Sequence, residues 1–163
     1  NIKLSFDIEG GDFDISNQYE PLLIGSMDVG IAMQNATLAA ESLGYGIVYC
    51  GGVRGFAKGI SELLNIPENA LFLCGLSIGV IDEEKSTEKV KPRLPHEANV
   101  GYNEFPKSNE EVLKQYRQTM IDFAEARETK TWTKKFADFY AQPSGIEAVT
   151  KELLEKNGFV NKK

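Results

Sequence analysis

The longest element that the sequence predicts runs over residues 21–44 and reads as a helix from Met27 onward. Its apolar residues are spread over most of its faces, which is typical of a helix that is covered on all sides. Small residues recur along it at a spacing that permits another helix to approach closely: Gly30, Ala32, Ala36 and Ala40. Gly44 stands where a helix C-cap is expected, and a strand over residues 47–50 follows directly. We therefore expect a buried helix that leads straight into a strand.

The rest of the chain alternates short apolar segments with helical patterns. Residues 1–9 alternate apolar and polar side chains, which predicts a short strand. The near-continuous apolar run over residues 71–81 predicts a buried strand, and residues 100–105 predict another short one. Helices are predicted over residues 55–64, from an N-cap at Asn109 to Ala124, from Trp132, and over residues 146–157. This order predicts a mixed α/β chain that forms a single domain over residues 1–163.

The balance of charge excludes several classes of function. The 163 residues include 18 Lys and Arg against 24 Asp and Glu, which gives a net charge of −6. An acidic chain without a basic block is a poor ligand for nucleic acids and anionic membranes, and no apolar run reaches the length of a membrane span. We therefore expect neither nucleic acid nor a membrane among its partners.

Cysteine and histidine offer little metal chemistry in this sequence. Cys50 and Cys74 lie far apart in apolar runs, without metal-ligand spacing. Two interpretations stay open for them: buried free thiols in a reducing cytosol, which we favour, or a disulfide. His96 is the single histidine, reads as an ordinary loop residue and cannot build a zinc site of several ligands. We expect no metal site and no hydrolase with paired carboxylates.

Two glycines, Gly51 and Gly52, follow the strand over residues 47–50. Ligands of open α/β sheets bind at the carboxyl ends of strands, and glycine lets backbone amides approach a planar ring closely. Preorganised N–H donors along the rim of such a ring would tune its chemistry. The alternative is a tight strand-to-helix turn that binds nothing. The pair does not match the dinucleotide fingerprint, because Val53, Arg54 and Gly55 follow it.

Fixed positive charge is predicted where the sequence reads Lys-Pro-Arg-Leu-Pro, over residues 91–95. Side chains at i and i+2 of an extended segment point the same way, and the prolines stiffen it, so Lys91 and Arg93 could hold one phosphate. Shielded charge-assisted hydrogen bonds of this kind contribute roughly 1.5–3 kcal/mol each. The alternative is a solvated loop whose cations pair with the acidic stretch 82–88.

A second cationic link lies between two predicted helices and holds Arg127 and Lys130 beside Thr129 and Thr131. Such a link could take a 2′-phosphate, or it could be only a solvated connection. Trp132, which follows it, is expected to be a packing anchor rather than a stacking platform.

Four ordered motifs resemble the nitroreductase superfamily. They lie over residues 25–28 with 34–44, over 46–54, over 63–68 and over 91–95. The Lys-Pro-Arg-Leu-Pro motif and the long helical tail are similar to the group A branch, which holds oxygen-insensitive NADPH nitroreductases and NADPH:FMN oxidoreductases. The resemblance is dense over residues 22–100 and looser beyond them.

The resemblance implies an α+β fold with a central sheet flanked by helices, in an intertwined homodimer with FMN at the subunit interface. The helix over residues 27–44 would form the dimer core. Contacts with the isoalloxazine ring are implied for Tyr49, Cys50, Gly51, Gly52 and Val53. Contacts with the FMN phosphate or ribityl chain are implied for Lys91 and Arg93, and contacts with the 2′-phosphate of NADPH for Arg127 and Lys130.

The activity that the resemblance implies is hydride transfer from NADPH or NADH through FMN to nitroaromatics, quinones or free flavin. It would follow ping-pong kinetics in a cytoplasmic enzyme. No catalytic acid or base is implied, because the flavin carries the chemistry. The choice between NADPH and NADH stays open, since the tail is poor in arginine. The alternative is a non-catalytic flavin-binding or dimerisation module on the same scaffold.

Family members open with a His-Arg-Ser-type motif that supplies many phosphate and ring contacts, and this sequence does not contain it. The chain starts at Asn1, in what reads as the middle of a domain. We therefore expect it to represent the C-terminal two-thirds of a nitroreductase domain, with an N-terminal portion missing. Residues 106–163 would form its helical C-terminal extension.

Overall fold

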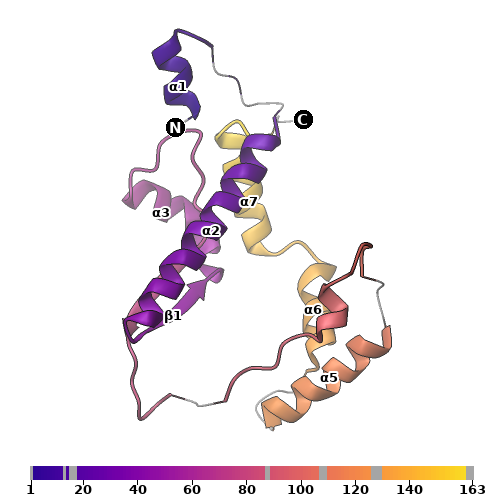
Figure 1. Cartoon of the computed structure of the whole chain (residues 1–163). Coiled ribbons are helices and arrows are strands. Elements are labelled where there is room, and N and C mark those ends of the chain that lie inside the picture. Colours follow the sequence, from indigo (N-terminus) through magenta and orange to yellow (C-terminus); the bar gives the residue numbers. More distant parts are fainter. Residues whose placement is uncertain are drawn as a thin grey trace. The chain divides into compact units, whose positions relative to one another are not determined.

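The computed structural model describes residues 2–12, 14, 18–86, 89–106, 110–125 and 130–160. The chain divides into two compact units, and Figure 1 labels most of their helices and one strand. The first unit comprises Asn1–Lys85 and Gly145–Lys163, so the last helix belongs with the N-terminal part of the chain. The second unit comprises Ser86–Ser144.

Helix α2 (Glu20–Ser42) is the longest element of the first unit. It begins at Glu20 and not at Met27, so the predicted start is wrong. Pro21 is tolerated in the first turn, because the N–H that it lacks would have no helical partner there. The predicted end is confirmed, since Gly44 has a φ of 82° and donates its N–H to Glu41 O at 3.0 Å.

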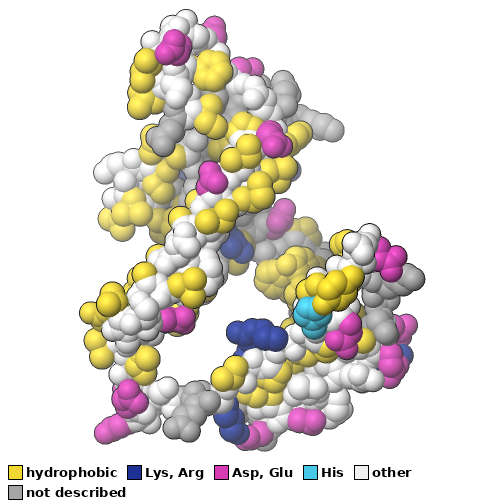
Figure 2. Space-filling view, in the orientation of Figure 1, with side chains coloured by type: hydrophobic (Ala, Val, Ile, Leu, Met, Phe, Trp, Pro, Cys, Tyr) yellow, Lys and Arg dark blue, Asp and Glu magenta, His cyan; other side chains and the backbone are white. Residues whose placement is uncertain are grey.

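Most of the apolar surface of α2 is exposed. Thr37 and Ala40 are its buried residues, whereas Ile31 is 62% exposed and Leu38 57% exposed. Figure 2 shows hydrophobic side chains at the surface along this helix. The prediction of a helix covered on all sides is therefore wrong for the described chain. The physical reason is that β1 packs against one stripe of the helix and leaves the other apolar faces bare.

Strands β1 (Tyr45–Cys50) and β2 (Gly75–Val80) form an antiparallel pair. The register runs from Tyr45 opposite Val80 to Cys50 opposite Gly75. The prediction of β1 is confirmed. The second strand is shorter than the predicted 71–81 and is not buried, since Val80 is 87% exposed. Within the described residues the sheet holds only these two strands, so β2 has no neighbour on its outer edge to cover it.

A pair of hydroxyl groups fixes β1 to α2. Thr37 Oγ1 and Tyr49 Oη lie 2.8 Å apart, and Tyr49 Oη also donates to Gln34 Oε1 at 3.2 Å. Thr37 is only 4% exposed, so its hydroxyl depends on this partner. A buried polar group without a hydrogen bond costs roughly 1–3 kcal/mol. The pair therefore sets the position of β1 along the helix, and with it the position of the glycines that follow.

The 3-10 helix η1 (Gly52–Phe56) and helix α3 (Ala57–Leu63) continue directly from β1. They confirm the predicted helix over residues 55–64, apart from its first turn. Both contact helix α7 (Gly145–Lys156). The bounds of α7 confirm the predicted last helix. A Cβ built on Gly55 would lie 3.6 Å from Ile146 Cγ1, and Lys58 pairs with Glu152 at 3.5 Å. The end of β1 is thus supported by an element from the far end of the chain.

Residues Ile2–Glu9 form helix α1 and not the predicted strand. A strand needs a neighbour to satisfy its backbone, and the described sheet consists of β1 and β2 alone. A helix closes its hydrogen bonds within the segment. Lys3 and Asp7, one helical turn apart, add an ion pair at 2.8 Å. The short alternation of apolar and polar residues was therefore a misleading signal.

In the second unit, α5 (Glu110–Ala124) and α6 (Trp132–Ala141) pack together, and α4 (His96–Asn99) is a single turn. The first two confirm predicted helices, while the predicted cap at Asn109 lies outside the described residues. Residues 100–105 form no strand, since the described part of this unit offers no strand to pair with. His96 opens α4 and does not lie in a loop, so that prediction is wrong.

Trp132 is the packing anchor that the sequence predicts. Its ring meets Tyr116 of α5 edge-on at 5.2 Å between centroids and stacks on Phe136 of α6 at 5.2 Å. Tyr116 is 7% exposed, so the α5–α6 contact is the core of this unit. None of the described helices is both long and apolar enough to cross a membrane.

We expect Tyr49→Phe to lower the free energy of unfolding by about 1–3 kcal/mol, because it leaves the Thr37 hydroxyl buried without its partner. Urea unfolding followed by circular dichroism measures the change. Tyr45→Phe is the matched control, because Tyr45 lies on the same strand and its exposed fraction of 42% is close to the 44% of Tyr49. Equal losses in the two variants would show that the hydroxyl pair does not hold β1.

Candidate functional site

The turn between β1 and η1 is a stretch of bare backbone. A Cβ built on Gly52 would meet no atom within 4 Å, and one built on Gly51 would meet only the guanidinium of Arg54, at 3.6 Å. The β-ladder ends at Cys50, and the first bond of η1 joins Arg54 N–H to Gly51 O at 3.2 Å. The backbone between these points borders open space, as the approach of a flat ligand requires. We call residues 51–53 the glycine shelf.

The flanks of the shelf are tied into the fold. Tyr49 directs its hydroxyl to α2, and Cys50 is half-buried opposite Gly75. A Cβ on Gly75 would lie 3.4 Å from Cys50 Cβ and 3.7 Å from Val53 Cγ2. Both cysteines are free, so the disulfide that the sequence left open is not formed. The five predicted ring contacts are consecutive in the chain, and their contact with a ring stays a prediction.

Arg54 is a functional candidate that sequence reasoning missed. Its Nη1 lies 3.5 Å from Leu73 O, and the same guanidinium borders Gly51. These contacts hold a positive charge at the edge of the glycine shelf, where it would stabilise negative charge that develops on a bound ring. The sequence signal that could have identified Arg54 was its position two residues after the glycine pair.

Lys91 and Arg93 lie in a segment of the second unit that forms neither helix nor strand. Both residues are exposed, while Pro92 between them is half-buried, which is the alternation that the sequence predicts. Tyr116 donates its hydroxyl to Pro92 O at 3.1 Å, so α5 holds the segment in addition to its prolines. Arg93 donates Nη1 to Lys91 O at 2.8 Å. The two cations therefore stand on a backbone that is anchored to the core of this unit.

A small cleft of the second unit, about 90 Å³ in volume, gathers three lysines, and we call it the lysine cleft. Lys91 comes from the segment before α4, Lys130 from the link before α6 and Lys135 from α6 itself. Its apolar wall consists of Met120, Ile121, Ala124 and Trp132. The structure thus brings Lys91 and Lys130 together, although the sequence assigned them to different phosphates. Arg127 lies outside the described residues, and Lys135 was missed because nothing in the helical pattern linked it to Lys91.

Asp138 supplies counter-charge beside this cleft. Lys134, one turn earlier on α6, forms an ion pair with it, and Lys130 Nζ lies 2.9 Å from Asp138 Oδ2. The hydrogen bond from Lys134, and then that from Lys130, lower the pKa of the Asp138 carboxyl below its ordinary value of 3.8. Lys130 is therefore shared between Asp138 and the lysine cleft.

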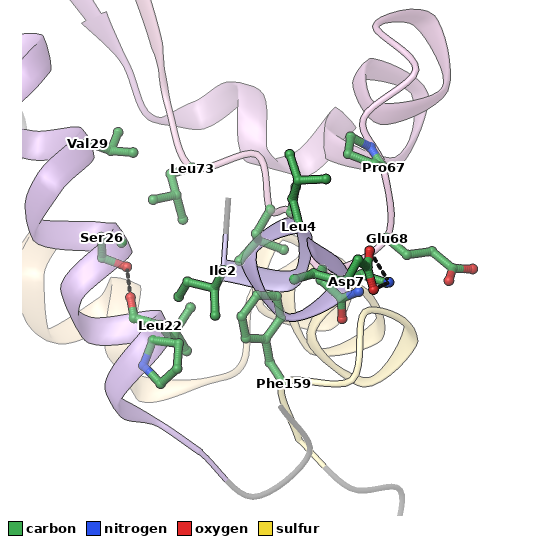
Figure 3. A pocket seen from close by; sticks show the side chains of 16 residues that line it. Ile2, Leu4, Asp7, Leu22, Ser26, Val29, Pro67, Glu68, Leu73 and Phe159 are labelled. Carbon is green, nitrogen blue, oxygen red and sulfur yellow. Dashed lines mark hydrogen bonds and ion pairs between the residues drawn. The ribbon is translucent and has the colours of Figure 1, made fainter. Parts of the chain in front are cut away.

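The larger cleft of the first unit, about 610 Å³ in volume, lies between α1, the first half of α2 and residues 67–73 (Figure 3). Its lining is mainly apolar, with Leu22 and Phe159 among its walls, and the charges of Lys3 and Asp7 are paired with each other. None of the described residues that the sequence predicts for the site lines it. Size alone would favour this cleft as a ligand site. A site that orients a polar ligand also needs several polar groups that point at it, and the backbone of the glycine shelf offers them. The glycine shelf is therefore the stronger candidate.

The predicted site residues fall into two groups, one in each unit. The glycine shelf lies in the first unit, and Lys91, Arg93 and Lys130 lie in the second. Their convergence on one ligand stays a prediction. Within the described residues, no group of three or more His, Cys, Asp or Glu side chains could hold a metal ion.

Two family models match the chain. The model described as the nitroreductase family matches residues 17–80, and the model of its C-terminal domain matches residues 91–162. The chain belongs to the nitroreductase family. The first match contains the glycine shelf and the second contains Lys91, Arg93 and the lysine cleft, so the resemblance noted in the sequence is confirmed.

Curated relatives and solved structures agree with this family. The chain is 40% identical over 157 residues to a protein named CR(VI) reductase from Pseudomonas sp. (strain G-1), covering 93% of this chain and 62% of the relative. It is 36% identical over 160 residues to a Bacillus subtilis protein named FMN reductase (NAD(P)H), covering 94% of this chain and 62% of the relative. The chain thus spans about three fifths of the length of these relatives.

A solved structure titled NADPH:FMN oxidoreductase from Vibrio harveyi complexed with NAD+ matches the fold with a TM-score of 0.80 at 32% identity. The match covers 100% of this chain and 65% of that chain. Nitroreductase A from Vibrio parahaemolyticus matches with a TM-score of 0.81 at 33% identity, over 100% of this chain and 65% of that one. The α+β nitroreductase fold that the sequence predicts is therefore confirmed.

We expect the pKa of the Asp138 carboxyl to lie below 3.8 and to rise in a Lys134→Ala variant, because Lys134 and Lys130 stabilise its charged form. Since the folded pKa is lowered, the stability that this group contributes is present above the unfolded pKa and is lost as the pH falls through the folded pKa. Carbon-13 NMR of the carboxyl measures the titration. Lys151→Ala on α7 should leave the Asp138 pKa unchanged, and a wild-type pKa of 3.8 or more would contradict the assignment.

Proposed function

We propose that the protein is an FMN-dependent oxidoreductase that passes a hydride from NADPH or NADH to small-molecule acceptors such as nitroaromatics, quinones or free flavin. The observation that carries the proposal is the glycine shelf, a run of bare backbone at the end of β1 in a chain of the nitroreductase family. Relatives named FMN reductase and NADPH-flavin oxidoreductase support the cofactor and the reductant.

The shelf fits a flat ring, because the space beside Gly52 is open where any other residue would place a side chain. Five residues would line the isoalloxazine: Tyr49, Cys50, Gly51, Gly52 and Val53. FMN, when bound, supplies a ring that accepts and releases a hydride. Backbone N–H groups of the shelf would bind the edge of the ring, and Arg54 would hold positive charge beside Gly51.

The second unit would bind the phosphates. We assign Lys91 and Arg93 to the FMN phosphate or ribityl chain, and Arg127 and Lys130 to the 2′-phosphate of NADPH. The exposed positions of Lys91 and Arg93 on a segment held by Tyr116 support the first assignment. Charges on an ordered backbone lose little further entropy when a ligand binds.

We propose that the enzyme is a cytoplasmic homodimer with α2 at its core, and that each flavin site takes residues from both subunits. Apolar side chains of α2 that are more than a third exposed support this arrangement: Leu23, Ile24, Met27, Val29, Ile31 and Leu38. Large exposed apolar patches on soluble proteins commonly mark interaction surfaces, and a twofold pairing would bury this one against itself. Two free thiols fit a reducing compartment.

The complete protein should bind FMN, retain the visible flavin spectrum through gel filtration, and oxidise NADPH when a quinone or nitroaromatic is present. Parallel double-reciprocal plots would report the ping-pong order. Flavin binding without turnover would support the non-catalytic flavin-binding or dimerisation module instead. A complete protein that stays colourless with excess FMN would overturn the proposal.

Gly52→Ala tests the shelf directly. The added methyl meets no protein atom within 4 Å, so folding stability should hold, whereas the methyl occupies space that the ring needs. We expect the Kd for FMN to rise at least about tenfold, which corresponds to about 1.4 kcal/mol. Flavin fluorescence titration measures it. Gly59→Ala on α3, which also meets nothing within 4 Å, is the matched control; unchanged FMN affinity in Gly52→Ala would remove the shelf from the site.

A further inference from the structure

None of the described residues that we assign to FMN or NADPH lines the larger cleft of the first unit, which we call the apolar cleft. Its volume of about 610 Å³ lies within the range of roughly 300–1,000 Å³ that is typical of pockets for small organic ligands. Side chains from α1, α2, the segment before β2 and the segment after α7 form its walls (Figure 3). Most of these side chains are hydrocarbon, among them Ile2, Leu4, Leu22, Val29, Leu73 and Phe159. A ligand of this cleft therefore needs an apolar body.

The charged side chains of the apolar cleft do not balance. Among the described residues that line it, Lys3, Asp7 and Glu68 are charged at neutral pH. Lys3 and Asp7 form an ion pair with each other at 2.8 Å, whereas no described residue pairs with the Glu68 carboxylate. Glu68 is exposed, so its charge lies at the solvent side of the cleft. The lining thus carries one unpaired negative charge, which attracts a cation and repels an anion.

The segment that leads into the cleft strengthens this preference. Residues 1–20 contain five Asp or Glu against a single Lys, and the whole chain has a net charge of −6. A surface whose charges share one sign raises the local concentration of small ions of the opposite sign. A cation would therefore approach the apolar cleft more readily than an anion of the same shape.

We propose that the apolar cleft binds a small organic cation with an apolar body, such as a hydrophobic quaternary ammonium ion, whose positive charge lies beside Glu68. The body would contact Leu22, Leu73 and Phe159, and the removal of its surface from water supplies most of the affinity. The Glu68 carboxylate supplies the selectivity between cation and anion, because an exposed ion pair contributes little affinity. This binding does not depend on the flavin.

A pair of fluorescent ligands tests the proposal on the full chain. Both have a diphenylhexatriene body, which becomes fluorescent in an apolar environment, and one carries a trimethylammonium group where the other carries a propionate. We expect saturable binding of the cationic probe, about two- to fivefold tighter than that of the anionic probe at low ionic strength. Fluorescence titration measures both affinities.

Two glycines of α2 test where the probe binds. Gly25 lines the apolar cleft and Gly30 does not, and a Cβ built on either glycine meets no atom within 4 Å. Gly25→Leu fills part of the cleft, so we expect the Kd for the cationic probe to rise at least about tenfold. Gly30→Leu is the matched control and should bind the probe like wild type. Both variants replace a helical glycine by a better helix former, so α2 should persist.

Glu68→Gln tests the charge. We expect it to weaken binding of the cationic probe about two- to fivefold and to leave or raise the affinity for the anionic probe, because the unpaired carboxylate is removed. Glu62→Gln on α3 is the matched control, since Glu62 is also exposed but does not line the cleft. Equal effects of the two substitutions would remove Glu68 from the site and contradict the choice of a cation.

Four further results would contradict the proposal. The first two are binding that is not saturable and equal affinities of the two probes for wild type. The third is equal affinity of the cationic probe for Gly25→Leu and Gly30→Leu. The fourth is displacement of the probe by FMN, which would place the probe in the flavin site. Absence of binding in the complete protein would show that another part of the protein covers the cleft, and this result would also reject the proposal.

Discussion

The contact between Thr37 and Tyr49 is the constraint on which the first unit depends. A two-stranded sheet is marginally stable in water, so β1 needs a helix to pack against. The hydroxyl pair selects one position on α2, because a slip of one residue would turn Tyr49 to the other face of the strand. That position determines where β1 ends, and therefore where Gly51 and Gly52 present bare backbone.

The two units contribute different physical interactions. In the proposed site the backbone of the glycine shelf would orient a flat ring, and Arg54 would add positive charge at the edge of the shelf. The second unit offers fixed cations on a segment that Tyr116 anchors to α5, and Asp138 moderates one of them. Under this proposal the contacts with the ring and the contacts with the phosphates would come from separate parts of the chain, so variants in one part would alter affinity without disturbing the other.

Local signals in the sequence predicted the elements that depend on neighbours along the chain. The end of α2 at Gly44, strand β1 and helices α5 to α7 all follow from turn residues, caps and periodicity. Predictions failed where the structure depends on partners. The α1 segment alternates like a strand, but no strand of the described residues lies beside it. The apolar faces of α2 indicate that they need to be covered without showing what covers them. Arg54 and Lys135 were missed for the same reason, since Leu73 and Lys91 meet them from distant segments.

The central claim is that a flat flavin ring lies against the backbone of residues 51–53. Proton–nitrogen NMR of the full chain during titration with FMN tests it most directly, because ring currents shift the amide signals of residues under a ring. The claim predicts that the amides of Gly51, Gly52 and Val53 show the largest saturable shifts in the first unit. Saturation of FMN binding with these signals unmoved, and the largest shifts at the walls of the 610 Å³ cleft, would contradict it.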